Sequence, residues 1–161
     1  MKILWTDGSA VPNPGKGGFA VIEEGVDGGR PVALGGGDNT TNIRMEAEAM
    51  IAAIEYAGDE PCEIHTDSEF WINVLTKWAP SWKKNDWHKA SDKKFDVAGN
   101  FVGYKESSIK NLDLVKKLYE DFSTHDVTLV WVRGHVGNEL NEMADEWANK
   151  AREGIRLPSL L

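Results

Sequence analysis

Short apolar runs alternate with glycine-rich turns over residues 1–40. The segments 2–9, 18–24 and 31–35 each have the length and composition of a β-strand, and the turn at 27–29 contains two glycines. Consecutive strands that are joined by such short turns pair antiparallel. The pattern therefore predicts a three-stranded antiparallel meander near the N-terminus.

From residue 41 the apolar positions follow the period of an α-helix instead. In residues 41–58, the side chains of Ala47, Met50 and Ile54 fall on one helical face, and a terminal glycine supplies the stop signal. This segment is predicted to be an amphipathic helix that packs against the meander.

The rest of the chain alternates strands and helices. We expect a strand at 62–66, helical segments at 71–78 and 109–122, a further strand at 127–132 and a last helix at 138–152. The strand at 127–132 is apolar throughout, as a strand covered on both faces should be. This order predicts an α/β fold, a mixed sheet with helices on its faces, in which ligands gather beyond the carboxyl ends of the strands.

The composition fits one compact domain, so we expect residues 1–161 to form a single domain. The chain is 41% apolar, and no window approaches the roughly 18 uninterrupted apolar residues of a membrane span. Cys62 is the only cysteine, which excludes an internal disulfide and suits a reducing compartment. The first residues lack the apolar core of a signal peptide. We expect a cytoplasmic monomer with no membrane partner.

Charge is distributed unevenly along the chain. The net charge is −8, but residues 77–117 contain ten lysines and five acidic residues, so this segment carries +5 and the remainder −13. The chain-wide average argues against a nucleic-acid partner, whereas a basic arm attached to an acidic body allows one.

Four acidic residues occupy positions from which one fold could bring them together. Asp7 and Asp67 stand where predicted strands end. Helical phase places Glu46 and Asp145 beside the apolar faces of their helices, whereas Glu48 is predicted to point to solvent. Each acid alone has an ordinary explanation: an aspartate at a strand end is commonly a turn former or a helix cap, and an inward-facing glutamate can simply be half-buried. Only the joint placement of the four acids indicates a functional site.

A cluster of four carboxylates would need a counterion. Each pair at ~4 Å costs roughly 4 kcal/mol at an effective dielectric of about 20, and without a cation the group would take up protons. Hard oxygen ligands favour Mg²⁺ or Mn²⁺, and a pair of such ions serves phosphoryl transfer. The acids therefore predict a divalent-metal site.

Five segments, in order, resemble the signature segments of type 1 ribonuclease H. They are TDGSAVPNPGKGGFA, TTNIRMEAEAMIAAIEYA, HTDSEF, WKKNDW and WVRGHVGNELNEMADEWA, and the match covers about residues 2–152. The resemblance implies a ribonuclease H-like fold: a three-strand antiparallel meander plus two parallel strands, flanked by helices, with a basic helical protrusion at 77–110. It also implies an endonuclease that cleaves the RNA strand of RNA–DNA hybrids with two divalent ions, leaving 5′-phosphate and 3′-hydroxyl ends.

The resemblance also assigns the catalytic residues. The acids would hold two Mg²⁺ ions, with Mn²⁺ as a possible substitute. His135, in a glycine-flanked loop, would assist the reaction or product release, although a lone histidine in such a loop is otherwise ordinary surface. The implied metal ligands are Asp7, Glu46, Asp67 and Asp145.

Contacts with the hybrid are implied in the same way. Polar groups would touch the shallow minor groove, where 2′-hydroxyls mark the RNA strand. Lysines of the arm would add salt-sensitive affinity, while its tryptophans could serve packing instead. The implied contacts are Gly8, Asn13, Asn42 and Glu69 for the RNA strand, Thr41 and Asn111 for a phosphate of the DNA strand, and Trp82, Lys83, Lys84, Trp87 and Lys89 on the arm.

The sequence also departs from the family pattern. Ile43 stands where a polar residue is expected, and Asn39 stands where arginine is frequent, which should weaken the DNA-phosphate pocket. Residues 95–109 lengthen the arm, and their apolar alternation around a Gly-Asn pair predicts a small hairpin of unknown role. The tail 153–161 is short and apolar, and either packs on the domain or binds a partner.

Other classes of site are less consistent with the sequence. The glycines near Lys16 lack the spacing of a phosphate-binding P-loop, the four histidines and one cysteine lack zinc spacing, and no GxSxG motif is present. Two alternatives stay open. One is an integrase-like strand transferase, which would share the carboxylates, and the other is a non-catalytic module that binds hybrid.

Overall fold

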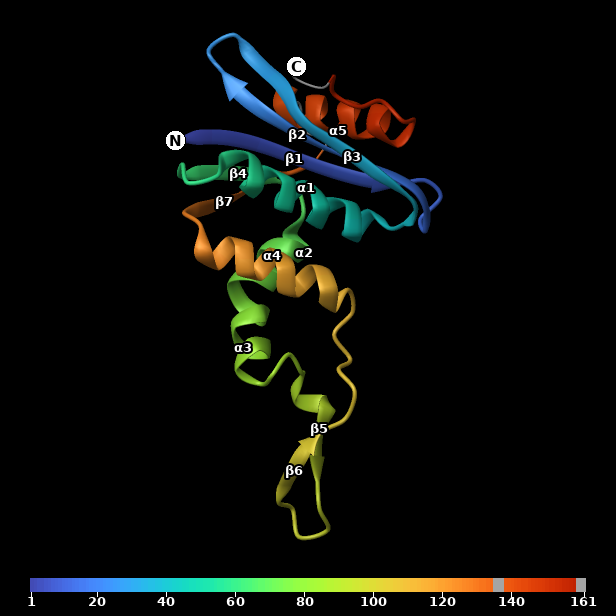
Figure 1. The fold of residues 1–161 in the computed structure, drawn as a ribbon, viewed down its shortest axis with the longest axis vertical. Coiled ribbons are helices and arrows are strands. Elements are labelled where there is room, and N and C mark those ends of the chain that lie inside the picture. The colour runs from blue at the N-terminus through green and yellow to red at the C-terminus, as the bar shows by residue number, and fades with distance from the viewer. Residues whose placement is uncertain (135–137, 159–161) are drawn as a thin grey trace.

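The structure, a computed structural model, describes residues 1–134 and 138–158. The described residues form a five-stranded mixed sheet with helices on both faces, and an arm extends from this body (Figure 1). The strand order is β3-β2-β1-β4-β7, in which the first three are antiparallel and β1, β4 and β7 are parallel. The predicted fold class is confirmed. The strands are β1 (Lys2–Ala10), β2 (Gly15–Gly25), β3 (Gly28–Thr40), β4 (Cys62–Thr66) and β7 (Val127–Trp131).

Neighbouring residues of β1 point into two separate cores. Leu4 is fully buried among the side chains of α1 (Asn42–Ala57) and α4 (Leu112–Thr124), whereas Trp5 packs with Ala144 of α5 (Glu139–Arg152) on the opposite face. This alternation follows from the two-residue period of a strand. None of the described helices is long and apolar enough to cross a membrane.

β2 and β3 are longer than the sequence pattern predicts. The pairing continues past the predicted end of the third strand at residue 35, through Gly36 and Gly37, and places Gly36 opposite Gly18. A Cβ on Gly18 would lie 2.2 Å from the backbone nitrogen of Arg152. Glycine is therefore needed here to let the end of α5 rest directly on the sheet, rather than to reverse the chain.

Two predictions for the second half of the chain are corrected. β7 is an edge strand, and all five of its residues are half-exposed or exposed, so it is not covered on both faces. α4 begins at Leu112, not at 109, because Asn111 adopts a left-handed conformation (φ +56°) that a helix cannot continue through. Ile109 is nevertheless buried in the core.

The arm is built from a broken helix and a hairpin. α2 (Glu69–Asn73), a π-helical turn at Val74–Trp78 and α3 (Ala79–Lys84) follow one another without a loop, which confirms the second predicted helical stretch. A 3₁₀ turn at Ala90–Asp92 then leads into the hairpin of β5 (Lys93–Phe95) and β6 (Phe101–Tyr104). The predicted hairpin is confirmed, and it forms the far end of the arm (Figure 1).

The described part of the tail lies against the body. Leu157 and Pro158 line a shallow pocket together with Val32 of β3 and Tyr56 of α1. The guanidinium of Arg156 donates to the backbone carbonyl of Ala151 at 2.7 Å, which ties the tail to the end of α5. This agrees with the prediction of packing, whereas residues 159–161 lie outside the described residues.

Candidate active site

Two aspartates lie at the same level of neighbouring parallel strands. β1 and β4 pair in parallel as far as Trp5 opposite His65, and Asp7 and Asp67 each stand two residues further along. The sequence places Asp7 at the end of its strand, but β1 continues to Ala10. It is β4 that ends here, which leaves one side of β1 open beside Asp7.

Gly8 determines how closely α1 approaches the strand. A Cβ at this position would lie 2.3 Å from the carbonyl carbon of Met45 and 2.5 Å from the backbone nitrogen of Glu46. Such distances are far shorter than van der Waals contact, so only glycine allows the helix backbone to sit there. The contact brings the Glu46 side chain next to Asp7.

Three carboxylates form a group that could hold a metal ion. One oxygen from each of Asp7, Glu46 and Asp67 lies within 4.8 Å of the other two. Asp7 is buried, and the other two are half-buried. Hard oxygens in such number, on rigid elements and partly shielded from water, are the ligands that Mg²⁺ and Mn²⁺ prefer.

The electrostatics of the group favour a cation. Burial, and then the charge of Asp67, raise the pKa of Asp7 to about 8, although the Gly8 amide donates to its Oδ1 at 2.9 Å and opposes the shift. Burial likewise raises the pKa of Glu46 to about 7, with a further contribution from Asp67. Each ionised carboxylate thus destabilises the next, and a divalent ion among them would relieve the repulsion.

Asp145 lies outside this group of three but within its electric field. It is half-buried on α5, between the buried residues Asn141 and Ala148, as helical phase predicts. Its charge contributes to the raised pKa of Asp7, so the two side chains are electrostatically coupled. The fourth predicted ligand is therefore near enough to Asp7 to act on its charge, from the helix on the other face of the sheet.

Ser68, which with Asp67 forms a ready N-cap pair in the sequence, has a second role that the sequence reasoning missed. Its hydroxyl accepts a hydrogen bond from the Trp71 amide at 3.2 Å and caps α2, so the capping role falls to Ser68 and not to Asp67. A hydrogen bond from Ser68 also lowers the pKa of Glu46 and opposes the effect of burial. Ser68 is buried, follows Asp67 directly in the chain and is hydrogen-bonded to Glu46, so it links these two acids. Its position directly after Asp67 is the signal in the sequence that could have identified it.

His135 lies outside the described residues, and so does Gly137 of its motif. The described chain leads to it at Gly134, where a Cβ would lie 3.1 Å from Oδ2 of Asp67. The described chain therefore comes directly beside the acidic group at Gly134, one residue before His135 in the sequence.

Asn13 and Asn42 hold the loop after β1 to the start of α1. The Ala10 amide donates to Oδ1 of Asn42 at 2.6 Å, and the Asn42 amide donates to Oδ1 of Asn13 at 3.1 Å. Both residues are predicted contacts with the RNA strand, and the structure brings them together beside Ala10. Glu69 is exposed at the start of α2, on the opposite flank of the group.

Thr41 and Asn111 are brought together by a residue that the sequence reasoning missed. Thr41 caps α1 by accepting from the Arg44 amide, and the Arg44 guanidinium donates to Oδ1 of Asn111 at 3.3 Å. The same guanidinium pairs with Asp113 at 2.8 Å. Arg44 thus places a cation, paired with Asp113, beside two residues that were predicted to contact a DNA phosphate. Its spacing of three residues from the cap is the signal that could have identified it.

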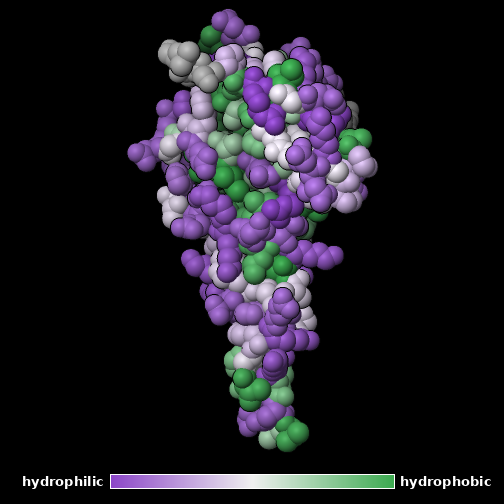
Figure 2. All heavy atoms as spheres, turned by 45° about the vertical axis from the view of Figure 1, so that its right-hand side comes forward, coloured by the Kyte–Doolittle hydropathy of each residue, from purple (hydrophilic) through white to green (hydrophobic). Residues whose placement is uncertain are grey.

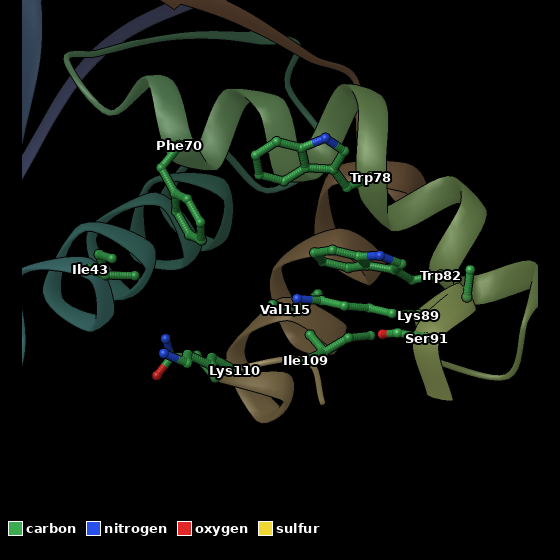
Figure 3. Close-up of a pocket in the computed structure, with 11 residues that line it drawn as sticks. Ile43, Phe70, Trp78, Trp82, Lys89, Ser91, Ile109, Lys110 and Val115 are labelled. Atoms are coloured by element: carbon green, nitrogen blue, oxygen red, sulfur yellow. The ribbon is translucent and has the colours of Figure 1, made fainter. Parts of the chain in front are cut away.

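A larger apolar pocket of about 550 Å³ lies where the arm joins the body (Figure 3). Ile43 of α1 and Phe70 of α2 face it from one side, and Trp82 lies across it with the Lys89 side chain running beneath the ring. The Lys89 ammonium is 5.8 Å from the centre of the Trp82 ring. The departure at Ile43 therefore makes this surface apolar rather than polar.

The other predicted arm residues differ in accessibility. Lys83 and Lys84 are exposed, whereas Trp87 is half-buried and meets Tyr119 of α4 edge-on at 6.0 Å. Trp87 also has a positive φ of +62°, held by a hydrogen bond from its amide to the Trp82 carbonyl at 2.7 Å. Its environment favours packing, the alternative that the sequence left open.

The mixed sheet and the acidic group at the ends of its parallel strands define an α/β protein of ribonuclease H-like fold. The sequence model of the RNase H family matches residues 1–153. A ribonuclease H of Granulibacter bethesdensis is 40% identical over 152 residues, which are 92% of this chain and 90% of that protein. The chain belongs to the RNase H family.

Solved structures agree with the fold. LC9-RNase H1, described as a type 1 RNase H with the type 2 active-site motif, superposes with a TM-score of 0.76 at 25% identity, over 96% of this chain and 74% of that one. LC11-RNase H1, solved in complex with RNA/DNA hybrid, has a TM-score of 0.64 at 22% identity, over 95% of this chain and 97% of that one. The second likeness supports the fold alone.

Proposed function

We propose that the protein is an endonuclease that hydrolyses the RNA strand of RNA–DNA hybrids. The single observation that carries the proposal is the group of Asp7, Glu46 and Asp67 at the open side of β1, in a chain of the RNase H family. In the proposed reaction a water oxygen attacks the phosphorus and the bond from phosphorus to the 3′-oxygen breaks. The water loses a proton, the 3′-oxygen gains one, and 5′-phosphate and 3′-hydroxyl ends result.

The carboxylates would hold two Mg²⁺ ions, or Mn²⁺ in their place. Such ions activate the attacking water and stabilise charge on the leaving oxygen. Asp7, Glu46 and Asp67 contribute ligand oxygens from fixed elements, and Asp145 completes the set from α5. In this scheme His135 assists proton movement or product release.

Substrate would be held on both sides of this site. Gly8, Asn13, Asn42 and Glu69 flank the acidic group and would meet the minor groove of the hybrid, where 2′-hydroxyls identify the RNA strand. The support is that the loop 10–15 and the start of α1 are pinned together by the two asparagines.

The DNA strand would cross toward the arm. Thr41 and Asn111 would receive one of its phosphates next to the Arg44 guanidinium, since cations and polar hydrogens favour an anion there. Beyond them, Trp82 and the exposed lysines of the arm would hold the strand by apolar contact and charge. Trp87 would act by positioning these residues. The arm residues concerned are Trp82, Lys83, Lys84, Trp87 and Lys89.

A cleavage assay with end-labelled substrates tests the proposal. With Mg²⁺ the protein should cut the RNA of a hybrid and leave single-stranded RNA and duplex DNA intact. Asp7→Asn and Asp67→Asn should each lower the rate by at least about 10³-fold and still bind hybrid, because a missing ligand removes stabilisation that is specific to the transition state. Glu142→Gln, an exposed acid on α5, is the matched control and should keep full activity.

Each other outcome has a definite meaning. Full activity of either aspartate variant would refute the metal-site assignment. Binding of hybrid without any cleavage by the wild-type protein would indicate a non-catalytic module, and joining of DNA ends would indicate a strand transferase.

A further inference from the structure

A continuous series of ring contacts runs along the hairpin at the end of the arm. His88 and Tyr104 stack at 4.2 Å with an angle of 8° between their planes. Tyr104 meets Phe101 at 5.1 Å, and Phe101 meets its cross-strand neighbour Phe95 at 6.2 Å. We refer to His88, Tyr104, Phe101 and Phe95 as the aromatic ladder.

The outer half of the aromatic ladder is open to solvent. Phe95 is 58% exposed and Phe101 is 51% exposed, and none of the four rings belongs to the cores of the body. Hydrophobic side chains are visible at the end of the arm in the space-filling view (Figure 2). Exposed aromatic rings cost hydration free energy, and folding of the body does not require them, so a binding role is the better explanation.

The hairpin is a well-defined element, not a loose loop. Asp92 is buried at its root, where Oδ2 accepts hydrogen bonds from the amides of Lys89 and Ser108. At the tip, Oδ1 of Asp96 accepts from the amides of Ala98 and Asn100, both at 2.9 Å. These contacts fix the rings in one arrangement before any ligand arrives, which reduces the entropy lost on binding.

The charge around the aromatic ladder suits a polyanion. Residues 88–105, which carry the ladder, contain four lysines and two aspartates and so have a net charge of +2, and each aspartate accepts hydrogen bonds from backbone amides near it. The segment is part of residues 77–117, which together carry +5 in a chain of net charge −8. The lysines are Lys89, Lys93, Lys94 and Lys105.

We propose that the aromatic ladder binds unpaired nucleotides of a strand that continues beyond the hybrid held at the active site. Exposed rings among lysines are the combination that single-stranded nucleic acids require, because bases stack on the rings while cations follow the phosphates. In a duplex the bases are stacked on one another and cannot stack on the rings, so a duplex could bind here only through its phosphates and the lysines. The proposal rests on the proposed function for the placement of the hybrid, but not for binding of the single strand itself.

Fluorescence anisotropy without divalent ions tests this inference, since it measures binding without cleavage. The probes are a blunt RNA–DNA hybrid and the same hybrid with a single-stranded DNA tail at either end. A tail at one end should tighten binding at least about fivefold, as expected when one base stacks on a ring. A double-stranded extension of equal length should give no such gain. An equal increase in affinity from the single-stranded tail and from the double-stranded extension would overturn the proposal.

Substitutions separate stacking from general apolar contact. Phe101→Leu and Phe95→Leu keep apolar volume but lose the ring, and should remove the gain from the tail, whereas Phe101→Tyr should retain it. Val97→Ala, at the fully exposed tip, is the matched control and should bind like the wild type. Retention of the gain in both leucine variants would mean that the tail does not stack on these rings and would contradict the proposal.

Cleavage of the blunt hybrid separates this inference from the proposed function. The leucine variants should cut the blunt hybrid at a rate within about twofold of the wild type, since the β5–β6 hairpin that carries both residues forms the far end of the arm, away from the sheet (Figure 1). If the wild-type protein cuts blunt hybrid but binds the tailed hybrid no more tightly than the blunt one, only the proposal for the aromatic ladder is refuted. A protein that binds the tail but cuts no hybrid would refute the proposed function alone.

Discussion

Asp7 is buried in the middle of the sheet, beside Asp67 and within the electric fields of Glu46 and Asp145. Burial, and then the neighbouring charges, raise its pKa from an ordinary 3.8 to about 8. Between these two values the folded protein binds a proton at Asp7 that the unfolded chain has already released. The free energy of unfolding of the metal-free protein therefore falls as the pH rises through this window.

Asp7→Asn should remove the contribution of Asp7 to this dependence and leave that of Glu46. At about pH 9 without metal the variant should be more stable than the wild type by about 1–2 kcal/mol, and at about pH 5 the two should be nearly equal. Urea unfolding at both pH values in the presence of a chelator measures the difference. Added Mg²⁺ should stabilise the wild type more than the variant, because the ion binds the folded carboxylates. Identical pH profiles for the two proteins would contradict the assigned pKa of Asp7.

Residue-level reasoning from the sequence located the acids but not their environment. The ends of apolar runs identify Asp7 and Asp67, although β1 itself continues past Asp7 to Ala10. Helical phase identifies Glu46 and Asp145, and both kinds of signal are local. Glu48 was predicted to point to solvent and is only half-exposed, and burial raises its pKa. Its environment depends on α4, which comes from a distant part of the chain. The helical phase of residues within α1 contains no information about which other helix packs against it.

At the scale of elements, the site depends on the packing of α1 against β1 at Gly8. Gly8→Ala would place a methyl group inside the helix backbone and force the two elements apart. We expect a loss of stability of about 1–3 kcal/mol and at least about a tenfold loss of cleavage, since Glu46 would move away from Asp7. Thermal unfolding and the rate of hybrid cleavage measure the two effects.

Gly25→Ala provides the matched control for this substitution. Its Cβ would have its nearest neighbour, the Gly28 carbonyl oxygen, at 3.6 Å, which is ordinary contact. The variant should be neutral or slightly more stable, because alanine restricts the unfolded chain. Equal loss of activity in both variants would show that the spacing of α1 and β1 does not govern the site.

The elements themselves were largely predictable, and the exceptions have physical causes. Periodicity finds the three strands of the meander and the helices, and the parallel strands follow from their order. It does not find the continuation of β2 and β3 through glycines, because a glycine in a strand and one in a turn look alike in sequence. The exposure of β7 also escapes prediction, since it depends on which strands α5 covers.

At the scale of the whole molecule, the charge separates into an acidic body and a basic arm. Replacing Lys83, Lys84 and Lys89 by alanine should raise KM for hybrid and leave kcat little changed, because these lysines bind phosphates away from the reacting atoms. The slope of log Kd against log salt should fall by about one for each phosphate that is no longer neutralised by a lysine. Binding measured from low to moderate salt provides this slope.

A lysine outside the arm controls for general charge. Lys150→Ala, on α5 beside Glu146, removes one positive charge from the body and should leave the slope unchanged. A triple variant with the salt slope of the wild type would mean that the arm does not touch the substrate. A slope reduced equally by Lys150→Ala would point to the net charge of the molecule rather than to the arm.

The hairpin leaves and rejoins the arm at almost the same point. The Lys105 amide donates to the Asp92 carbonyl at 2.9 Å, so the ends of the excursion are closed by a hydrogen bond before the hairpin begins. Segments with adjoining ends tolerate changes of length at small entropic cost. In engineering terms, residues 93–104 form a cassette: recognition sequences of other lengths could be exchanged there while the catalytic body stays as it is.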